Sequence, residues 1–165
     1  MNQSQRRSLL VFILVTLITL FTAHDVCAQT WGPLDREATI HEAQHVTSQV
    51  YPDADVVQLN ERRWVRYRQD GTYIEWHESY IKILTEKGRR RFQTISSFFT
   101  IPYNTTMVTL VEIIKPDGSP VRIDVEKKSR VMVRQGQMQS NIFNPNDRVL
   151  QVSIPELDRG DIVHW

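Results

Sequence analysis

The fold is decided by the stretch LNERRWVRYRQ-DG-TYIEWHESYIKIL, in which Leu59–Gln69 and Thr72–Leu84 flank Asp70-Gly71. Both flanks alternate charged residues with β-branched or aromatic residues, a pattern typical of paired strands. An Asp-Gly pair tolerates the positive φ angles of a tight type I′ turn. The stretch therefore predicts an antiparallel β-hairpin with a two-residue loop.

The predicted loop also sets the register of the hairpin. Pairing Gln69 with Thr72 fixes which side chains lie on each surface, and a slip of one residue would exchange the two surfaces. Four apolar side chains then share one surface that we expect to be buried: Val65 opposite Trp76, and Tyr67 opposite Ile74. Two ion pairs are expected on the other surface: Arg66 with Glu75, and Arg63 with Glu78.

Further short β-branched and aromatic segments follow the hairpin, separated by turn residues. Turns are predicted at Glu86-Lys87-Gly88 and Pro116-Asp117-Gly118, and a long exposed loop at Gln135–Asn146. Strands in succession with short connections predict antiparallel sheets, so residues 51–165 are expected to form an all-β sandwich. The predicted strands are Ile81–Thr85, Phe92–Phe99, Met107–Lys115, Val121–Val125, Arg130–Arg134, Arg148–Ile154 and Asp161–Trp165.

The sequence stops within an apolar strand, Ile162-Val163-His164-Trp165. An apolar strand without a polar tail leaves an open sheet edge when it is outermost. We therefore expect the sandwich to be incomplete at its C-terminal end, or its last strand to pair with another chain.

One helix is predicted before the strands, at Leu34–Val50, with Asp35 as its N-cap. It contains the motif His41-Glu42-Ala43-Gln44-His45, which matches the H-E-x-x-H pattern of zinc peptidases. On a helix, His41 and His45 share a face that can bind zinc, and Glu42 is placed as a general base. However, few residues precede this helix, and no later helix is predicted to supply a third ligand. A minimal zinc peptidase is therefore kept as an alternative, and no metal site is assigned.

The N-terminus has the layout of a secretory signal. Arg6 and Arg7 precede the apolar run Leu9–Phe21, and Val26-Cys27-Ala28 supplies small residues for cleavage. The run is shorter than the roughly 20 residues of a spanning helix. We predict a signal peptide at 1–28, a helical extension at 29–50, a periplasmic or secreted protein, and no membrane span after signal cleavage. The single cysteine, Cys27, leaves with the signal.

The charges are nearly balanced, with 20 Lys and Arg against 19 Asp and Glu. Nucleic-acid binding depends on a basic excess, so this class of partner is not expected. The arginine-rich segments at 62–68 and 89–91 are interpreted as solvated surfaces. No catalytic or cofactor-binding residues are assigned.

Several short motifs from Tyr51 onward stand in a specific order and spacing. They are Tyr51-Pro52-Asp53-Ala54-Asp55, Asp70-Gly71-Thr72, His77, Lys82–Gly88, Lys115-Pro116-Asp117-Gly118, Pro155 and Gly160-Asp161-Ile162-Val163. In this order and spacing, they resemble a bacterial domain of unknown function (domain-of-unknown-function family 3857) that usually precedes a transglutaminase-like domain. This resemblance implies an extracytoplasmic β-sandwich without catalytic residues of its own, N-terminal to a papain-like domain with a Cys-His-Asp centre.

These observations give a leading hypothesis and two alternatives. The leading one is a non-catalytic module, not an enzyme, that acts as a scaffold or binding partner of a transglutaminase-like domain absent from this chain. The first alternative is the zinc peptidase described above. The second is an independent carbohydrate- or peptide-binding module whose contact face contains Trp64, Tyr73 and His77.

Overall fold

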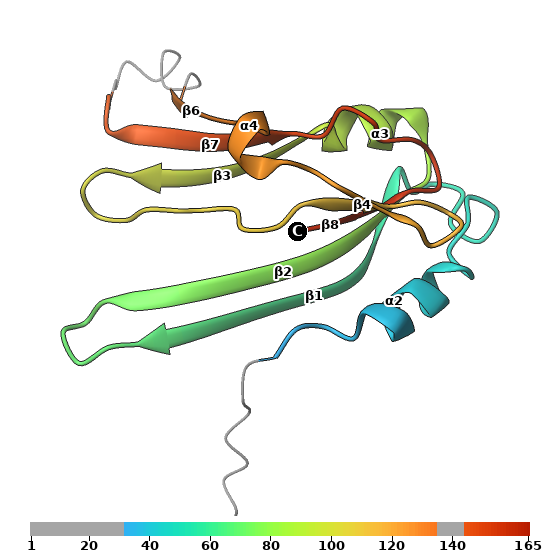
Figure 1. Ribbon diagram of the computed structural model, residues 1–165, viewed down its shortest axis with the longest axis horizontal. Helices are drawn as coiled ribbons and strands as arrows, with labels where there is room; N and C mark the ends of the chain where they lie inside the picture. The colour runs from blue at the N-terminus through green and yellow to red at the C-terminus, as the bar shows by residue number, and fades with distance from the viewer. Residues whose placement is uncertain (1–31, 135–143) are drawn as a thin grey trace, which may run out of the picture. The chain divides into compact units, whose positions relative to one another are not determined.

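The computed structural model describes residues 32–134 and 144–165, and Pro33–Trp165 forms one unit within it. Figure 1 shows this unit as two antiparallel sheets accompanied by short helices. The predicted signal peptide (1–28) and residues 135–143 of the predicted loop lie outside the described residues.

The larger sheet has five strands in the order β1-β2-β8-β4-β5, and the smaller has three in the order β3-β7-β6. All neighbouring strands are antiparallel, which confirms the predicted all-β sandwich. The strands are β1 (Val56–Tyr67), β2 (Tyr73–Ile83), β3 (Thr94–Thr100), β4 (Glu112–Ile114), β5 (Pro120–Arg122), β6 (Ser129–Val133), β7 (Asp147–Ser153) and β8 (Ile162–His164). The helices are α2 (Arg36–Ala43), α3 (Glu86–Phe92) and α4 (Val125–Lys128).

Two apolar clusters lie on opposite faces of the larger sheet, because side chains alternate between faces along each strand. The first cluster joins the two sheets and includes the buried residues Ile81, Ile83, Ile95, Ile113, Val152 and Val163. The second lies on the outer face, where α2 covers the sheet (Figure 1), and consists of Leu34, Ala43, Tyr80, Ile114 and Ile162. Helix α2 thus contributes to the outer cluster and not to the core between the sheets.

The hairpin forms as predicted, but its register differs by one residue. Its loop has three residues, Gln69 to Gly71, and Gly71 has a φ of +82°. The Asp70 carboxylate accepts hydrogen bonds from the backbone N–H (2.9 Å) and the hydroxyl (2.7 Å) of Thr72. These bonds hold Thr72 beyond the turn, so the loop has the longer form with glycine in the left-handed position rather than the two-residue type I′ form.

Because of the shifted register, the four side chains expected on one buried surface do not share a surface, and the prediction of that surface is wrong. Tyr67 pairs with Tyr73, and Trp64 pairs with Trp76. Val65 is 38% exposed and Tyr67 is 74% exposed, while Ile74 and Trp76 are partly exposed. The two expected ion pairs are also replaced: Arg63 lies 3.8 Å from Glu75, and Glu78 contacts His164.

The predicted turn at Glu86-Lys87-Gly88 is instead the start of helix α3. The Thr85 side chain caps this helix by accepting a hydrogen bond from the Gly88 N–H (3.1 Å). Gly88 is therefore not needed for a turn. It is needed for space, because a Cβ there would lie only 2.8 Å from Val56 Cγ1 and would overlap the Asp55 carbonyl.

Three other predicted elements have different limits. The helix expected at Leu34–Val50 is only eight residues long, although Asp35 caps it as predicted. In the strand expected at Met107–Lys115, only Glu112–Ile114 joins a sheet. Val125 begins helix α4, because the Asp124 carboxylate accepts a hydrogen bond from the Lys127 N–H.

The last strand is not at a sheet edge. Strand β8 lies between β2 and β4, and Ile162, Val163 and His164 pair with residues on both sides. Residues 162–164 therefore do not form an open edge. The expectation that the sandwich is incomplete at its C-terminal end stays a prediction.

Candidate functional site

A buried cluster of charged side chains lies on the outer face of the five-stranded sheet. His164 of β8 is 5% exposed, and each of its ring nitrogens contacts a carboxylate. The distances are 2.7 Å from Nδ1 to Glu112 Oε1 on β4 and 2.9 Å from Nε2 to Glu78 Oε1 on β2. The Tyr80 ring stacks on the imidazole, with 3.8 Å between ring centroids.

The segment that leads into α2 covers this cluster. The Arg36 guanidinium donates a hydrogen bond to Glu112 Oε1, and the Leu34 N–H donates to Glu78 Oε2 (2.9 Å). Buried ionised groups are tolerated only when they are paired and hydrogen-bonded. The two carboxylates and the two basic side chains satisfy one another in this way.

The two contacts between the His164 ring and the carboxylates cannot both be hydrogen bonds unless one of these groups carries an additional proton. An ionised carboxylate only accepts, and a neutral imidazole has a single N–H donor. Both ring contacts of His164 are therefore hydrogen bonds only when the imidazole carries two protons or one carboxyl group is protonated. Burial alone would raise the pKa of Glu112, but the hydrogen bonds from His164 and Arg36 outweigh it and hold that pKa below its ordinary value.

Burial raises the pKa of Tyr80 to about 12, and the negative charge of Glu78 adds to this effect. An unfolded chain would ionise this phenol near pH 10, whereas the native state keeps it neutral. The stabilisation is therefore complete below about pH 10 and lost as the pH rises to about 12, a loss of about 3 kcal/mol.

This pH dependence predicts a late-ionising tyrosine. A difference titration of tyrosinate absorbance, wild type minus Tyr80→Phe, is expected to show one step with a midpoint near pH 12. The control Tyr103→Phe changes an exposed ring and should leave that step in place. A step near pH 10 that is lost in Tyr80→Phe would contradict the burial argument.

The H-E-x-x-H residues lie at the end of α2. The helix ends at Ala43, whose carbonyl accepts a hydrogen bond from Lys82 Nζ (2.7 Å), so His45 lies beyond it. The rings of His41 and His45 are adjacent, with centroids 5.9 Å apart. Within residues 32–134 and 144–165, no three His, Cys, Asp or Glu side chains are grouped so as to hold a metal ion.

The proposed contact residues Trp64, Tyr73 and His77 do not share one surface. Trp64 and Trp76 contact each other on the α2 side of the hairpin, with ring centroids 4.6 Å apart and Arg66 beside both rings. Tyr73 lies on the opposite surface, as does His77, which contacts Glu61 (2.7 Å). The prediction of a single face that includes Trp64 is therefore wrong.

The surface that does contain Tyr73 also contains Tyr67 and Val65. The two tyrosine rings have centroids 5.7 Å apart, and Tyr73 is 57% exposed. On this surface of the hairpin, Val65 lies between the Tyr67–Tyr73 pair and His77. We call Val65, Tyr67 and Tyr73 the hairpin aromatic surface. It lies on the part of the hairpin that extends past β8, toward the left in Figure 1.

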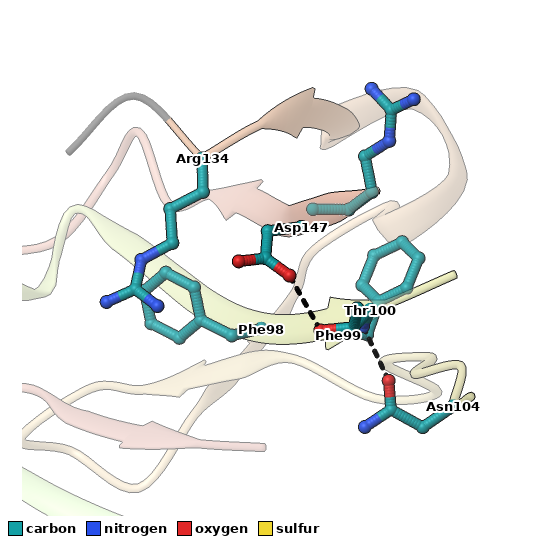
Figure 2. Close-up of a pocket in the computed structure, with 7 residues that line it drawn as sticks. Phe98, Phe99, Thr100, Asn104, Arg134 and Asp147 are labelled. Atoms are coloured by element: carbon teal, nitrogen blue, oxygen red, sulfur yellow. Dashed lines mark hydrogen bonds between the residues drawn. The ribbon is translucent and has the colours of Figure 1, made fainter. Parts of the chain in front are cut away.

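A small hollow lies at the end of the three-stranded sheet (Figure 2). Its volume is about 120 Å³, and Arg134 extends over the Phe98 ring at its side. The Asp147 carboxylate accepts a hydrogen bond from the Thr100 hydroxyl (2.9 Å), and Asn104 Oδ1 accepts one from the Thr100 N–H. Sites for small organic ligands usually have volumes of about 300 Å³ or more. The hollow is therefore too small for a sugar or peptide.

Four residues of the family resemblance join elements of the fold: Asp55, Thr85, Lys115 and Asp161. Lys115 Nζ donates to Asp161 Oδ2 (2.9 Å), which also accepts from the Asp158 N–H (2.7 Å). Asp161 is 1% exposed, so this contact fixes the start of β8. In the same way, the Asp55 carboxylate accepts from the Thr85 hydroxyl (2.7 Å) and joins the start of β1 to α3.

The sequence prediction missed the buried cluster, although a local signal existed. Glu112 follows Val111 and precedes Ile113-Ile114, and His164 follows Val163. A charged residue within an apolar strand must be paired when it is buried. That rule would have predicted that Glu112 and His164 each pair with another polar side chain, without identifying it.

The described residues define a β-sandwich module with an internally satisfied charge cluster and an exposed aromatic hairpin. A family model described as "Domain of Unknown Function with solved-structure structure (DUF3857)" matches residues 69–165. The chain belongs to this family, which confirms the family named by the resemblance; the association with a transglutaminase-like domain stays a prediction. No curated protein and no solved structure matches the chain. Among the described helices, none has the length and apolar character needed to cross a membrane.

Proposed function

We propose that this protein is an extracytoplasmic, non-catalytic module that binds a transglutaminase-like domain through the hairpin aromatic surface. The observation that carries this proposal is the exposure of Tyr67 and Tyr73 on a two-stranded extension. Exposed groups of large apolar side chains are typical of protein interaction sites. Tyrosine is favoured at such sites because its rigid ring buries a large area at low entropic cost.

A binding experiment tests the proposal. The probe is a purified transglutaminase-like domain, titrated into the isotope-labelled protein and followed by NMR. Shift changes are expected at Val65, Tyr67 and Tyr73, and the Tyr67→Ser/Tyr73→Ser variant is expected to bind at least about tenfold more weakly, because central aromatic residues dominate interface energies.

The matched control is Tyr51→Ser, which removes a partly exposed tyrosine from the turn before β1 and should leave the affinity unchanged. Equal affinity of the double variant and the wild type would refute the proposed surface. Absence of binding by the wild type would refute the proposed partner.

A further inference from the structure

The segment Pro33–Ala43 is attached to the sandwich by a separate set of contacts. Its apolar residues Leu34 and Ala43 pack only in the outer cluster, whereas the core between the sheets is made by other residues. Regions outside the main core of a protein open with lower free energy than the core itself. The sandwich can therefore stay folded when this segment detaches.

The polar contacts of the segment converge on the buried charge cluster. Leu34 and Arg36 bind Glu78 and Glu112, the same carboxylates that contact His164. Away from the cluster, Thr39 Oγ1 accepts a hydrogen bond from Asn60 (3.2 Å) and the Ala43 carbonyl accepts one from Lys82. Two of the polar contacts of the segment thus use the carboxylates of Glu78 and Glu112.

The groups around Glu112 determine its response to pH. It contacts Arg36 of α2 and His164 of β8, Tyr80 of β2 lies near it, and Arg122 pairs with it on β5. Glu78 of β2 contacts the other ring nitrogen of His164. Of the two side chains whose hydrogen bonds lower the pKa of Glu112, His164 belongs to the sheet and Arg36 to the segment, so the ionised form of Glu112 stabilises the attached state through Arg36. This stabilisation is present above the ordinary value of 4.5 and is lost as the pH falls through the lowered pKa.

We infer that Pro33–Ala43 is a pH-sensitive clasp, held closed by the Arg36–Glu112–His164–Glu78 cluster and opened by acid while the two sheets remain folded. Protonation of Glu112 removes the negative charge that pairs with Arg36, and so weakens the contact that holds the segment on the sheet. Opening exposes the outer cluster of Tyr80, Ile114 and Ile162. The inference is independent of the proposed partner.

Amide hydrogen exchange of the full chain tests the clasp. Glu112→Gln keeps the shape of the side chain but removes its charge, as protonation does. At about pH 7, exchange at residues 36–43 is expected to be at least about tenfold faster in this variant than in the wild type at the same pH. At acidic pH the ratio should approach one, since the wild type opens as well.

Arg36→Gln removes the same ion pair from the clasp side, and the same pattern is expected. The control Glu126→Gln changes an exposed carboxylate on α4 and should leave exchange at residues 36–43 unchanged. Two results would overturn the inference: a ratio near one at about pH 7 for Glu112→Gln, or an equal acceleration at β7 amides such as Val152, which would show that the sandwich opens with the segment.

Discussion

The Gly88→Ala variant is expected to lose about 3 kcal/mol of its free energy of unfolding. In an ordinary helix interior, this change stabilises a protein by up to about 1 kcal/mol, because alanine has the higher helix propensity. Here the new Cβ would lie 2.8 Å from Val56 Cγ1 and would overlap the Asp55 carbonyl. Backbone cannot move aside as a flexible side chain can, so α3 and the start of β1 must separate.

Denaturant titration measures this effect, and Gly118→Ala is the matched control. Gly118 has a φ of +85°, but no atom lies within 4 Å of the position of an added Cβ. Only backbone strain is expected there, with a loss of about 1 kcal/mol. A Gly88→Ala protein as stable as the wild type, or more stable, would show that Asp55 and α3 are not in close contact.

The Lys115→Met variant is expected to lose about 3 kcal/mol, because it removes one partner of a buried ion pair. The Asp161 carboxylate would remain 1% exposed, with the Asp158 N–H as a donor but without a cation. Chemical denaturation of the variant and the wild type measures this loss.

A double variant separates the lost charge from lost packing. Asp161→Asn removes the negative charge and keeps an oxygen that accepts the hydrogen bond from the Asp158 N–H. Lys115→Met/Asp161→Asn is therefore expected to be more stable than Lys115→Met alone. If the double variant is less stable than the single variant, the uncompensated charge is not the cause of the loss.

The sequence predicted the hairpin but not its register, and the reason is local. The prediction depended on a two-residue loop at Asp70-Gly71, the strongest short-range hairpin signal. In the structure, the hydrogen bonds from Thr72 to the Asp70 carboxylate add a residue to the loop. One added residue exchanges the two surfaces, so Tyr67 and Val65 became exposed instead of buried.

The buried charge cluster could not be assembled from the sequence, because its members are far apart in the chain. His164 is 52 residues from Glu112 and 86 residues from Glu78. Local patterns predict strands but not which strands become neighbours. Pairing of β8 with both β2 and β4 was needed to bring these three side chains together.

The turn predicted at Glu86-Lys87-Gly88 shows a second limit. Glycine after charged residues is typical of a turn, but the same residues form a helix when a threonine caps them. Thr85 accepts the hydrogen bond that starts α3, and the close approach of Asp55 requires glycine at position 88. A contact with a segment far away in the sequence, here between Gly88 and Asp55, is not visible in the local pattern.

The central position of β8 has a consequence for synthesis. Ribosomes produce β1, β2, β4 and β5 well before residues 162–164, yet β8 is the strand that joins β2 to β4. Until it emerges, the nascent chain holds two separate hairpins whose apolar inner edges have no neighbour. Such intermediates aggregate readily, because unpaired edges bind other chains.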